Sequence, residues 1–226
     1  MQAQLHAPSD ISVQPLRCPG GWLKRSVLHM PRQIAMPNYI SLTEAAARLQ
    51  TAYRVLIIGC SGSGKTTLGR AISDAFGLRC ITLDQEVLWQ SGWVERDDAE
   101  QYSMIAKLVQ EDRWVMDGTN PKTFDLRLPR ADLVLWPRLP RLACISGVTR
   151  RWLKYRGQTR PGMAQGCPEK LDAEFLHFIW TFEQTVSPRI IEGLDTHGPD
   201  VPVLVFRSRK EMTGLLTLSG APAQLS

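Results

Sequence analysis

An eight-residue stretch between an apolar run and a helical pattern constrains this chain more than any other feature. Residues 59–66 read Gly-Cys-Ser-Gly-Ser-Gly-Lys-Thr, so two glycines bracket four residues ahead of a lysine and a threonine. Residues 54–58 before it are apolar and rich in β-branched side chains, which is typical of a buried parallel strand. Residues 67–76 place apolar side chains at helical spacing, and Gly77 follows where a helix C-cap belongs. This order predicts a phosphate-binding loop.

The chemistry of such a loop follows from its backbone. Glycines let the chain curl so that several N–H groups point into one concavity, and the N-terminus of the next helix adds a partial positive charge there. Lys65 is expected to reach the β- and γ-phosphates of a nucleotide, and the Thr66 hydroxyl to ligate Mg²⁺. The alternative is a chance Gly/Ser turn, which the flanking strand and helix disfavour. The predicted nucleotide contacts in the loop are Gly59, Ser61, Gly62, Ser63, Gly64, Lys65, Thr66 and Thr67.

Composition is that of a globular protein. The chain has 226 residues, enough for one sizeable α/β domain, and 43% of them are hydrophobic. No apolar run approaches the roughly 18 residues of a membrane span, and no signal-peptide core is visible, so we expect a cytoplasmic protein with no membrane partner. The five cysteines are scattered without a CxxC pair, which indicates a reducing compartment and argues against a zinc site. Cys60, inside the loop, is interpreted as a small filler.

Two aspartates come directly after predicted strands. Residues 79–83 form an apolar run that ends at Asp84, and residues 114–116 form another that ends at Asp117. Carboxyl ends of parallel strands meet at one edge of a sheet, so both carboxylates are expected beside the loop. Asp117 is the better candidate for the water shell of Mg²⁺, while Asp84 could serve the metal's water or orient an acceptor. The predicted metal site therefore comprises Thr66, Asp84 and Asp117, and the alternative for each aspartate is a solvated turn.

Positive charge is unevenly distributed. The formal net charge is +5, yet residues 138–160 hold seven basic side chains and no acid. Residues 157–168 are rich in glycine and proline, which predicts a mobile loop. Arginines beside such a loop suggest a lid, about 150–170, that closes onto a transferred phosphoryl group; the alternatives are a solvated basic face and a nucleic-acid surface. The resulting catalytic candidates are Lys65, Asp84, Asp117, Arg150, Arg151, Arg156 and Arg160.

Other aromatic and basic residues allow more than one interpretation. Trp89 and Trp93 could stack on a base or cover the edge of the core. Apolar residues recur at helical spacing in residues 169–185, which favours a core-facing stripe over a ligand contact; its aromatic members are Phe175, Phe178 and Phe182. Residues 119–130 carry three cations that would lie near an acceptor's phosphate, namely Lys122, Arg127 and Arg130.

Strand and helix patterns alternate along the chain. The predicted strands are 54–58, 79–83, 114–116, 132–136 and 201–206; the predicted helices are 41–49, 67–76, 97–111, 141–155, 169–185 and a short one from 187. This alternation predicts an α/β protein with the three-layer α/β/α fold of P-loop NTPases, a five-stranded parallel sheet and an arginine-rich lid. Arg207 follows the fifth strand, where contacts with the nucleotide base are expected.

The ends of the chain differ from the middle. Residues 1–36 are interrupted by prolines and predict a poorly structured N-terminal leader. Residues 37–218 are expected to form the P-loop kinase-like domain, and residues 219–226 a frayed tail.

From about residue 54 to residue 210 the chain resembles the small P-loop kinases of the adenylate kinase and shikimate kinase group. It is more closely similar to bacterial topology modulation and adenylate kinase-like proteins. The shared features are the 59–66 loop, Leu83-Asp84, Gly-Trp-Val at 92–94, Trp-Val-Met-Asp-Gly at 114–118, Tyr-Arg-Gly-Gln-Thr-Arg-Pro at 155–161 and Gly-Cys-Pro-Glu at 166–169. The resemblance implies ATP and Mg²⁺ as the phosphoryl donor, a lid that carries arginines, and a nucleotide-like acceptor.

Three functional hypotheses follow. The first is a Mg²⁺-dependent phosphotransferase that moves the γ-phosphoryl group of ATP to a small acceptor, a nucleotide before other classes. The second is a nucleotide-binding regulator that contacts DNA through its basic segment, and the third is a kinase of a small non-nucleotide metabolite. Acceptor specificity lies in loops and pocket shape, so all three stay open at the level of the sequence, as does the oligomeric state.

Overall fold

The computed structural model describes residues 36–222. Residues 38–40 already belong to the fold. The N–H of Ile40 donates to the carbonyl of Val203 (3.0 Å), and the N–H of Val203 donates to the carbonyl of Asn38 (2.8 Å). Apart from its last residue, the predicted leader (1–36) lies outside the described residues.

The C-terminal end is ordered further than predicted. The N–H of Ser219 donates to Leu215, and the N–H of Ala221 donates to the carbonyl of Leu216 (2.9 Å). Both Ser219 and Ala221 are buried. The part of the predicted tail that the structure describes, residues 219–222, therefore continues the fold, and residues 223–226 lie outside the description.

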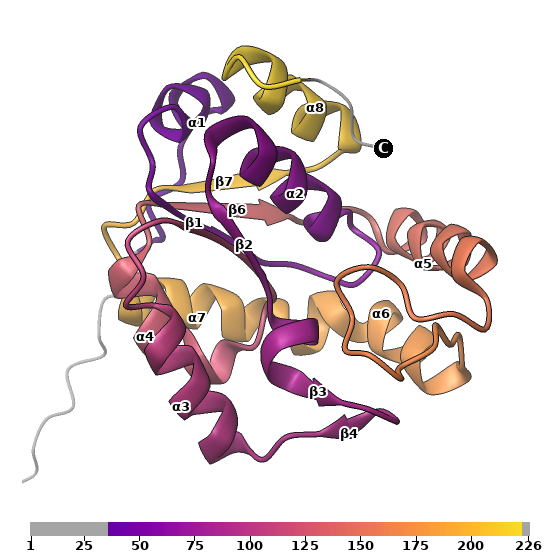
Figure 1. Ribbon diagram of the computed structural model, residues 1–226. Coiled ribbons are helices and arrows are strands. Elements are labelled where there is room, and N and C mark those ends of the chain that lie inside the picture. The colour runs from indigo at the N-terminus through magenta and orange to yellow at the C-terminus, as the bar shows by residue number, and fades with distance from the viewer. Residues whose placement is uncertain (1–35, 223–226) are drawn as a thin grey trace, which may run out of the picture. The chain divides into compact units, whose positions relative to one another are not determined.

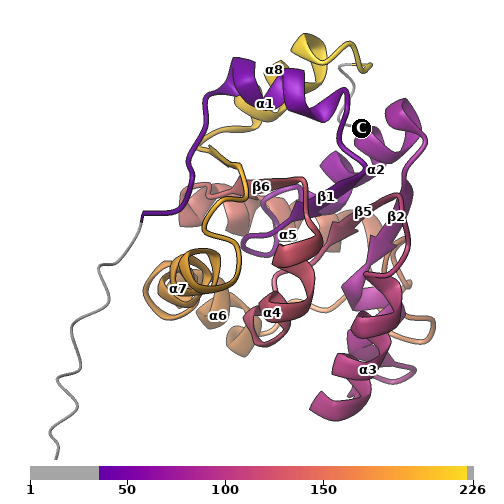
Figure 2. The same ribbon diagram turned by 90° about the vertical axis from the view of Figure 1, so that its left-hand side faces the viewer.

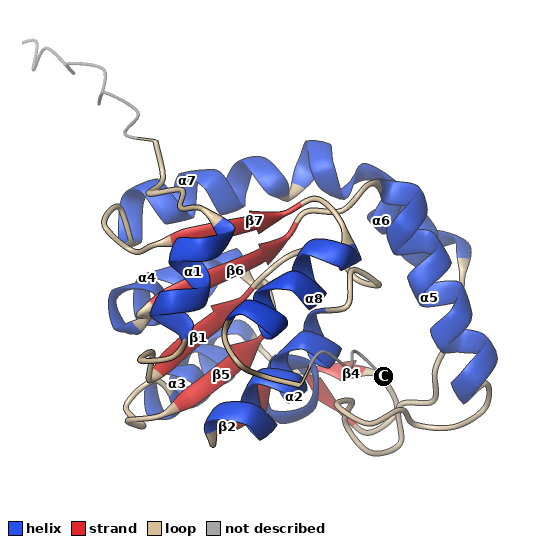
Figure 3. Ribbon diagram, turned by 90° about the horizontal axis from the view of Figure 1, so that it is seen from above, coloured by secondary structure: helices blue, strands red, loops and turns tan. Residues whose placement is uncertain are grey.

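A five-stranded parallel sheet with the order β2-β5-β1-β6-β7 lies at the centre of the protein (Figure 3). Numbered by the predicted strands, this order is 2-3-1-4-5, with a switch point beside the strand that leads into the glycine-rich loop. The predicted fold class is therefore confirmed. The strand bounds are β1 Arg54–Ile57, β2 Arg79–Thr82, β5 Trp114–Asp117, β6 Leu133–Pro137 and β7 Val203–Phe206.

Helices cover both faces of the sheet, as Figures 1 and 2 show: α1, α2 and α8 lie on one face, and α3, α4, α6 and α7 on the other. Strand periodicity divides the core accordingly. Val55 and Ile57 of β1 pack toward α1, α2 and α8, whereas Leu56 and Ile58 pack into the opposite cluster. The helix bounds are α1 Leu42–Leu49, α2 Lys65–Phe76, α3 Asp98–Leu108, α4 Phe124–Arg127, α5 Arg141–Tyr155, α6 Ala173–Thr185, α7 Ser187–His197 and α8 Arg209–Leu218.

Side-chain caps explain where several helices begin. The side chains of Ser41, Asp97, Asp172 and Ser208 each accept a hydrogen bond from the backbone N–H three residues on, which satisfies a free donor of the first turn. Gly77 ends α2 in the left-handed conformation, as predicted. The cap at Asp172 starts α6 later than the predicted residue 169, since the residues before it belong to the loop that follows α5.

Details of the amphipathic patterns differ from prediction. Tyr102 of α3 and Leu142 of α5 occur at the apolar spacing of their helices, but they are 41% and 67% exposed. Residues 84–95, for which no element was predicted, form a π-helical turn (η1, Asp84–Leu88) and a short antiparallel pair, β3 Trp89–Gln90 and β4 Val94–Glu95. Among the described residues, no helix is both long and apolar enough to cross a bilayer.

Candidate functional site

The glycine-rich loop joins β1 to α2 at the switch point of the sheet. Gly62 has φ +78°, and a Cβ atom at this position would lie 2.2 Å from the carbonyl oxygen of Cys144 on α5. Gly147 of α5 is equally constrained, because its Cβ would lie 2.1 Å from the carbonyl oxygen of Gly62. Close backbone approach therefore requires glycine on both sides. Gly64 caps α2 without a side chain, so the N–H groups of the first turn face the loop's concavity.

Neighbouring side chains hold this loop in place. Arg209, the first residue of α8, donates from Nη2 to the carbonyl of Gly62 (2.9 Å). The hydroxyl of Thr119 accepts from the N–H of Gly59 and donates to its carbonyl, both at 2.8 Å. The thiol of Cys60 is buried against that of Cys144, and this contact together with burial raises the pKa of Cys60, as suits a packing residue.

Thr66 and Asp117 form the candidate magnesium site. The Thr66 hydroxyl donates to Oδ2 of Asp117 (2.5 Å), at the start of α2 and the end of β5. Asp117 is 3% exposed, and its Oδ1 is buried without a hydrogen-bond partner. Burial raises the pKa of Asp117, against the opposing effects of Lys65 and the Thr66 hydrogen bond. An unpartnered carboxylate oxygen beside a hydroxyl fits a hydrated divalent cation, which would supply the missing positive charge.

Asp84 and Asp117 line the same cavity as the loop, as their strand-end positions predict. The volume of this cavity is about 630 Å³. Among the described residues, no three His, Cys, Asp or Glu side chains group as they would in an all-protein metal site. The predicted residues that line the cavity are Gly59, Ser61, Gly62, Gly64, Lys65, Thr66, Thr67, Asp84, Asp117, Arg150, Arg151 and Arg160.

Three predicted site residues lie elsewhere. Ser63 belongs to the loop, but it is fully buried and does not line the cavity. The guanidinium of Arg156 lies over the ring of Trp152 (5.0 Å), outside the cavity lining. Arg207 is exposed and lies in a separate hollow beside Tyr39. The predictions for Arg156 and Arg207 relied on position in the chain alone, whereas the direction of a side chain depends on its local backbone. Arg207 was expected to contact the nucleotide base, but it is Arg209, the first residue of α8, that lines the cavity.

The loop that follows α5 is docked over the cavity. A Cβ on Gly162 would lie 3.2 Å from Cγ2 of Thr66, and the carbonyl of Gly166 accepts from Gly92 (3.0 Å). The buried side chains of Met163, Ala164 and Cys167 pack against Trp89 and Trp93. The tryptophans thus cover a small buried cluster in the lid segment, which is closer to the predicted edge-covering role than to stacking on a base.

Ion pairs link this segment to the rest of the site. Arg160 contacts Asp84 (3.1 Å) and Glu169 (3.0 Å), and Glu169 also contacts Arg151 of α5 (2.6 Å). Glu169 escaped the sequence analysis because an acid beside a proline-rich loop resembles any surface acid. The signal that could have found it is its place in residues 166–169, the last of the stretches on which the sequence resemblance rests.

Several other residues missed by the sequence analysis line the cavity. Phe178 is 41% exposed at the cavity and Phe182 lies beside it, with ring centroids 5.6 Å apart, so this part of the predicted core stripe faces the site. The further residues are Arg70, Leu88, Gly118, Thr119, Asn120, Gly147, Lys154, Tyr155, Pro161, Arg209 and Met212. With Lys65 and the arginines already named, the basic side chains outnumber the two acids and make the cavity suited to polyphosphate.

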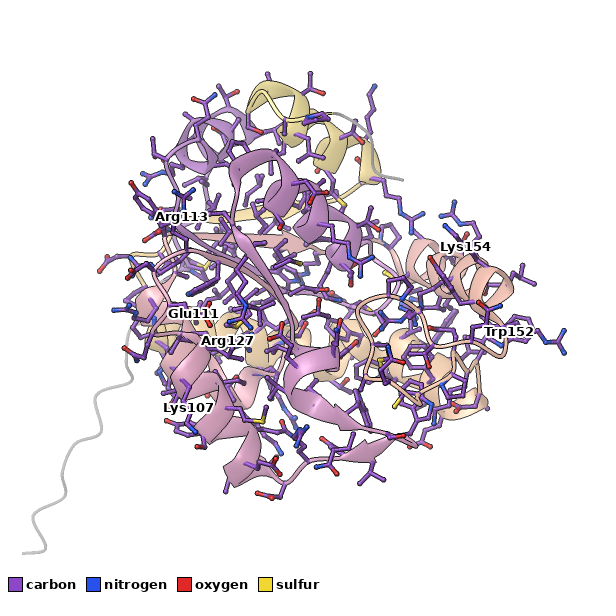
Figure 4. All side chains as sticks on the ribbon, viewed as in Figure 1. Lys107, Glu111, Arg113, Arg127, Trp152 and Lys154 are labelled. Atoms are coloured by element: carbon purple, nitrogen blue, oxygen red, sulfur yellow. The ribbon has the colours of Figure 1, made fainter. Side chains whose placement is uncertain are left out.

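The three cations of residues 119–130 do not reach the cavity lining. Lys122 pairs with Asp98 on the surface (2.7 Å), and Arg130 donates to the carbonyl of Val109 (3.2 Å). Arg127 is fully buried, in the interior seen in Figure 4, where its guanidinium donates to the carbonyls of residues 118, 119 and 120. Burial lowers the pKa of Arg127 to about 9, so it keeps its charge at neutral pH. Its role is to shape the loop after β5.

The strand order, the glycine-rich loop and the carboxylate at the end of the neighbouring strand define a P-loop protein of the α/β class. No protein-family model matches the chain, and no curated protein matches it. Among solved structures, it is similar to the shikimate kinase from Acinetobacter baumannii in complex with shikimate, with 14% sequence identity and a TM-score of 0.47. The match covers 76% of this chain and 96% of that one.

Proposed function

We propose that this protein is a phosphotransferase that moves the γ-phosphoryl group of ATP to a small acceptor in the presence of Mg²⁺. The observation that carries the proposal is the convergence on one cavity of the glycine-rich loop, the Thr66–Asp117 pair and arginines from α5 and the following loop. A binding protein needs the loop, but it does not need guanidinium groups placed opposite it. Such groups stabilise charge that spreads over phosphoryl oxygens during in-line transfer.

Each residue has a proposed role. Backbone N–H groups of the loop and the ammonium of Lys65 bind the phosphates. The hydroxyl of Thr66 would ligate Mg²⁺, with Asp117 holding its water shell. The ion neutralises phosphate charge when bound. Arg150 is exposed at the cavity and free to move onto a nucleotide, while Arg151 and Arg160 face the transferred group. Asp84 orients the acceptor, since its side chain is 40% exposed at the cavity.

A ring-bearing acceptor such as a nucleotide is the preferred class. Tyr155, Phe178 and Phe182 give one part of the cavity an aromatic surface on which a planar base can stack. The experiment is ATP consumption with Mg²⁺ against a panel of nucleoside monophosphates, nucleosides and small hydroxylated metabolites. Stimulation by one nucleotide supports the proposal in full, and stimulation by a metabolite moves the acceptor to that class. No stimulation despite tight ATP binding contradicts the phosphotransferase and favours the DNA-contacting regulator.

Replacing Asp117 with asparagine is expected to lower kcat about 10- to 100-fold and to raise the Mg²⁺ concentration that gives half-maximal rate. The amide keeps an acceptor for Thr66 but loses the charge that attracts the cation. The same change should leave the melting temperature of the ligand-free protein at pH 7 equal or higher. The raised pKa of Asp117 means that ionising the carboxyl in the fold costs stability as pH rises through that pKa, and asparagine removes this cost.

The matched control for this variant is Asp74→Asn, which changes an exposed aspartate on the far part of α2. It should leave both the rate and the Mg²⁺ dependence at wild-type values. Unchanged Mg²⁺ dependence in Asp117→Asn would remove Asp117 from the metal site.

A further inference from the structure

Glu169 lies between two arginines that come from different segments. Its Oε1 accepts from Nε and Nη2 of Arg151 on α5, at 2.7 and 2.6 Å. Its Oε2 is 3.0 Å from Nε of Arg160 in the docked loop. The side chain of Glu169 is only 3% exposed, and it is absent from the cavity lining that includes both arginines. Glu169 therefore contacts the two guanidinium groups from the side that faces away from the cavity.

Electrostatics explains why such a residue is needed. Burial lowers the pKa of Arg151, and the nearby charge of Arg160 lowers it further. Two partly buried guanidinium groups repel each other and lose hydration, so they stay close only if an anion is shared between them. Glu169 is placed to provide that anion, and its two oxygens are divided between the partners. The Nε edges of both arginines are taken up by this contact.

Asp84 contacts the same cluster from the cavity side. It is 3.1 Å from Nη2 of Arg160, but its side chain is 40% exposed, compared with 3% for Glu169. An ion pair open to solvent is weak and exchanges readily, whereas a buried one is costly to break. Phosphoryl oxygens entering the cavity can therefore replace Asp84 at Arg160 while the contact with Glu169 persists.

We propose that Glu169 is a positioning residue, which fixes Arg151 and Arg160 in the orientation that meets the transferred phosphoryl group. This inference rests on the proposed phosphotransfer. Glu169 touches neither nucleotide nor acceptor, and acts through the two guanidinium groups. Its buried pairs hold the arginines on the cavity wall, so less reorientation is needed when charge develops on the phosphoryl oxygens.

The test compares Glu169→Gln with Glu169→Asp in the full chain. Glutamine keeps the size but removes the charge, so kcat should fall about 10- to 100-fold while KM for ATP stays within about threefold. Binding of inorganic tripolyphosphate, measured by calorimetry, should be unchanged or tighter, because the cavity gains net positive charge. Aspartate should restore part of kcat. A merely structural role predicts the reverse pattern, in which turnover and tripolyphosphate binding fall together with the melting temperature.

Glu183→Gln is the matched control. Glu183 lies on α6 and pairs with Arg138, but its side chain is 53% exposed and it does not line the cavity. Its substitution should leave kcat unchanged. A kcat for Glu169→Gln within threefold of wild type, or a parallel loss of turnover and tripolyphosphate binding, would overturn the inference.

A readout that does not depend on turnover separates this inference from the proposed function. The Nε–H groups of Arg151 and Arg160 should give protected NMR signals in the wild type that are lost in Glu169→Gln but kept in Glu183→Gln. If the wild type shows no turnover with any acceptor, the proposed function fails. The anchoring of the arginines is then judged by these signals and by tripolyphosphate binding, and unchanged signals in Glu169→Gln would refute it.

Discussion

Replacing Lys65 with alanine should reduce Mg²⁺- and ATP-dependent turnover by about 10³-fold or more and leave the fold intact. The ammonium of Lys65 lies at the start of α2, where it donates to the carbonyl of Cys60 (2.9 Å). This contact is easily given up for a phosphate oxygen. Alanine removes the cation from the γ-phosphate, yet it is a good helix former and leaves no buried group unpaired. The measurement is kcat/KM for ATP with the acceptor found in the panel, alongside the melting temperature.

The control for this prediction is Lys107→Ala. Lys107 is exposed on α3, far from the glycine-rich loop in Figure 4, and its removal should change neither turnover nor melting temperature appreciably. Turnover retained in Lys65→Ala would refute the assignment of the loop as the site of phosphoryl transfer. A collapse of the melting temperature would instead show that Lys65 supports the fold.

The second large effect is expected on stability. Replacing Arg127 with methionine should lower the free energy of unfolding by about 3–5 kcal/mol. Methionine fills much of the space, but it leaves the carbonyls of Gly118, Thr119 and Asn120 without the donors that Arg127 provides. In a protein of this size the loss should lower the melting temperature by roughly 10 °C. Urea unfolding at pH 7 measures it directly.

Arg130→Met serves as the comparison for Arg127→Met. Arg130 is only partly buried and donates a hydrogen bond to the carbonyl of Val109, so the same substitution there should cost about 1 kcal/mol. Equal stability of the two variants would mean that the carbonyls after β5 find other partners, and that Arg127 does not shape the loop that carries Thr119 and Asn120.

The fold and the phosphate-binding loop were predictable because they depend on local patterns. Apolar runs that end in a glycine-rich turn or an aspartate identify parallel strands whose carboxyl ends meet, so Asp84 and Asp117 were placed correctly beside Lys65. Periodicity of apolar residues likewise predicted the strands and most of the helices. Alternation of strand and helix predicts parallel strands joined by crossovers, but the strand order β2-β5-β1-β6-β7 comes from the structure alone.

Long side chains were predicted less well. An arginine reaches far enough that its charge can lie on either side of its own backbone, so its position in the sequence does not indicate its target. Arg127 was assigned to an acceptor and instead lies buried against three carbonyls. Arg207 was assigned to the nucleotide, yet Arg209 reaches the loop.

By itself, the sequence determined the class of fold, the loop at the switch point and the two carboxylates, because strand and helix periodicity and backbone geometry are properties of neighbouring residues. Only the tertiary structure decided which basic side chains face the cavity. Arg151 and Arg160 line the cavity and both pair with Glu169, which is buried between them, whereas Arg156 lies over the ring of Trp152. Pairing of buried charges depends on contacts between segments that no local pattern specifies.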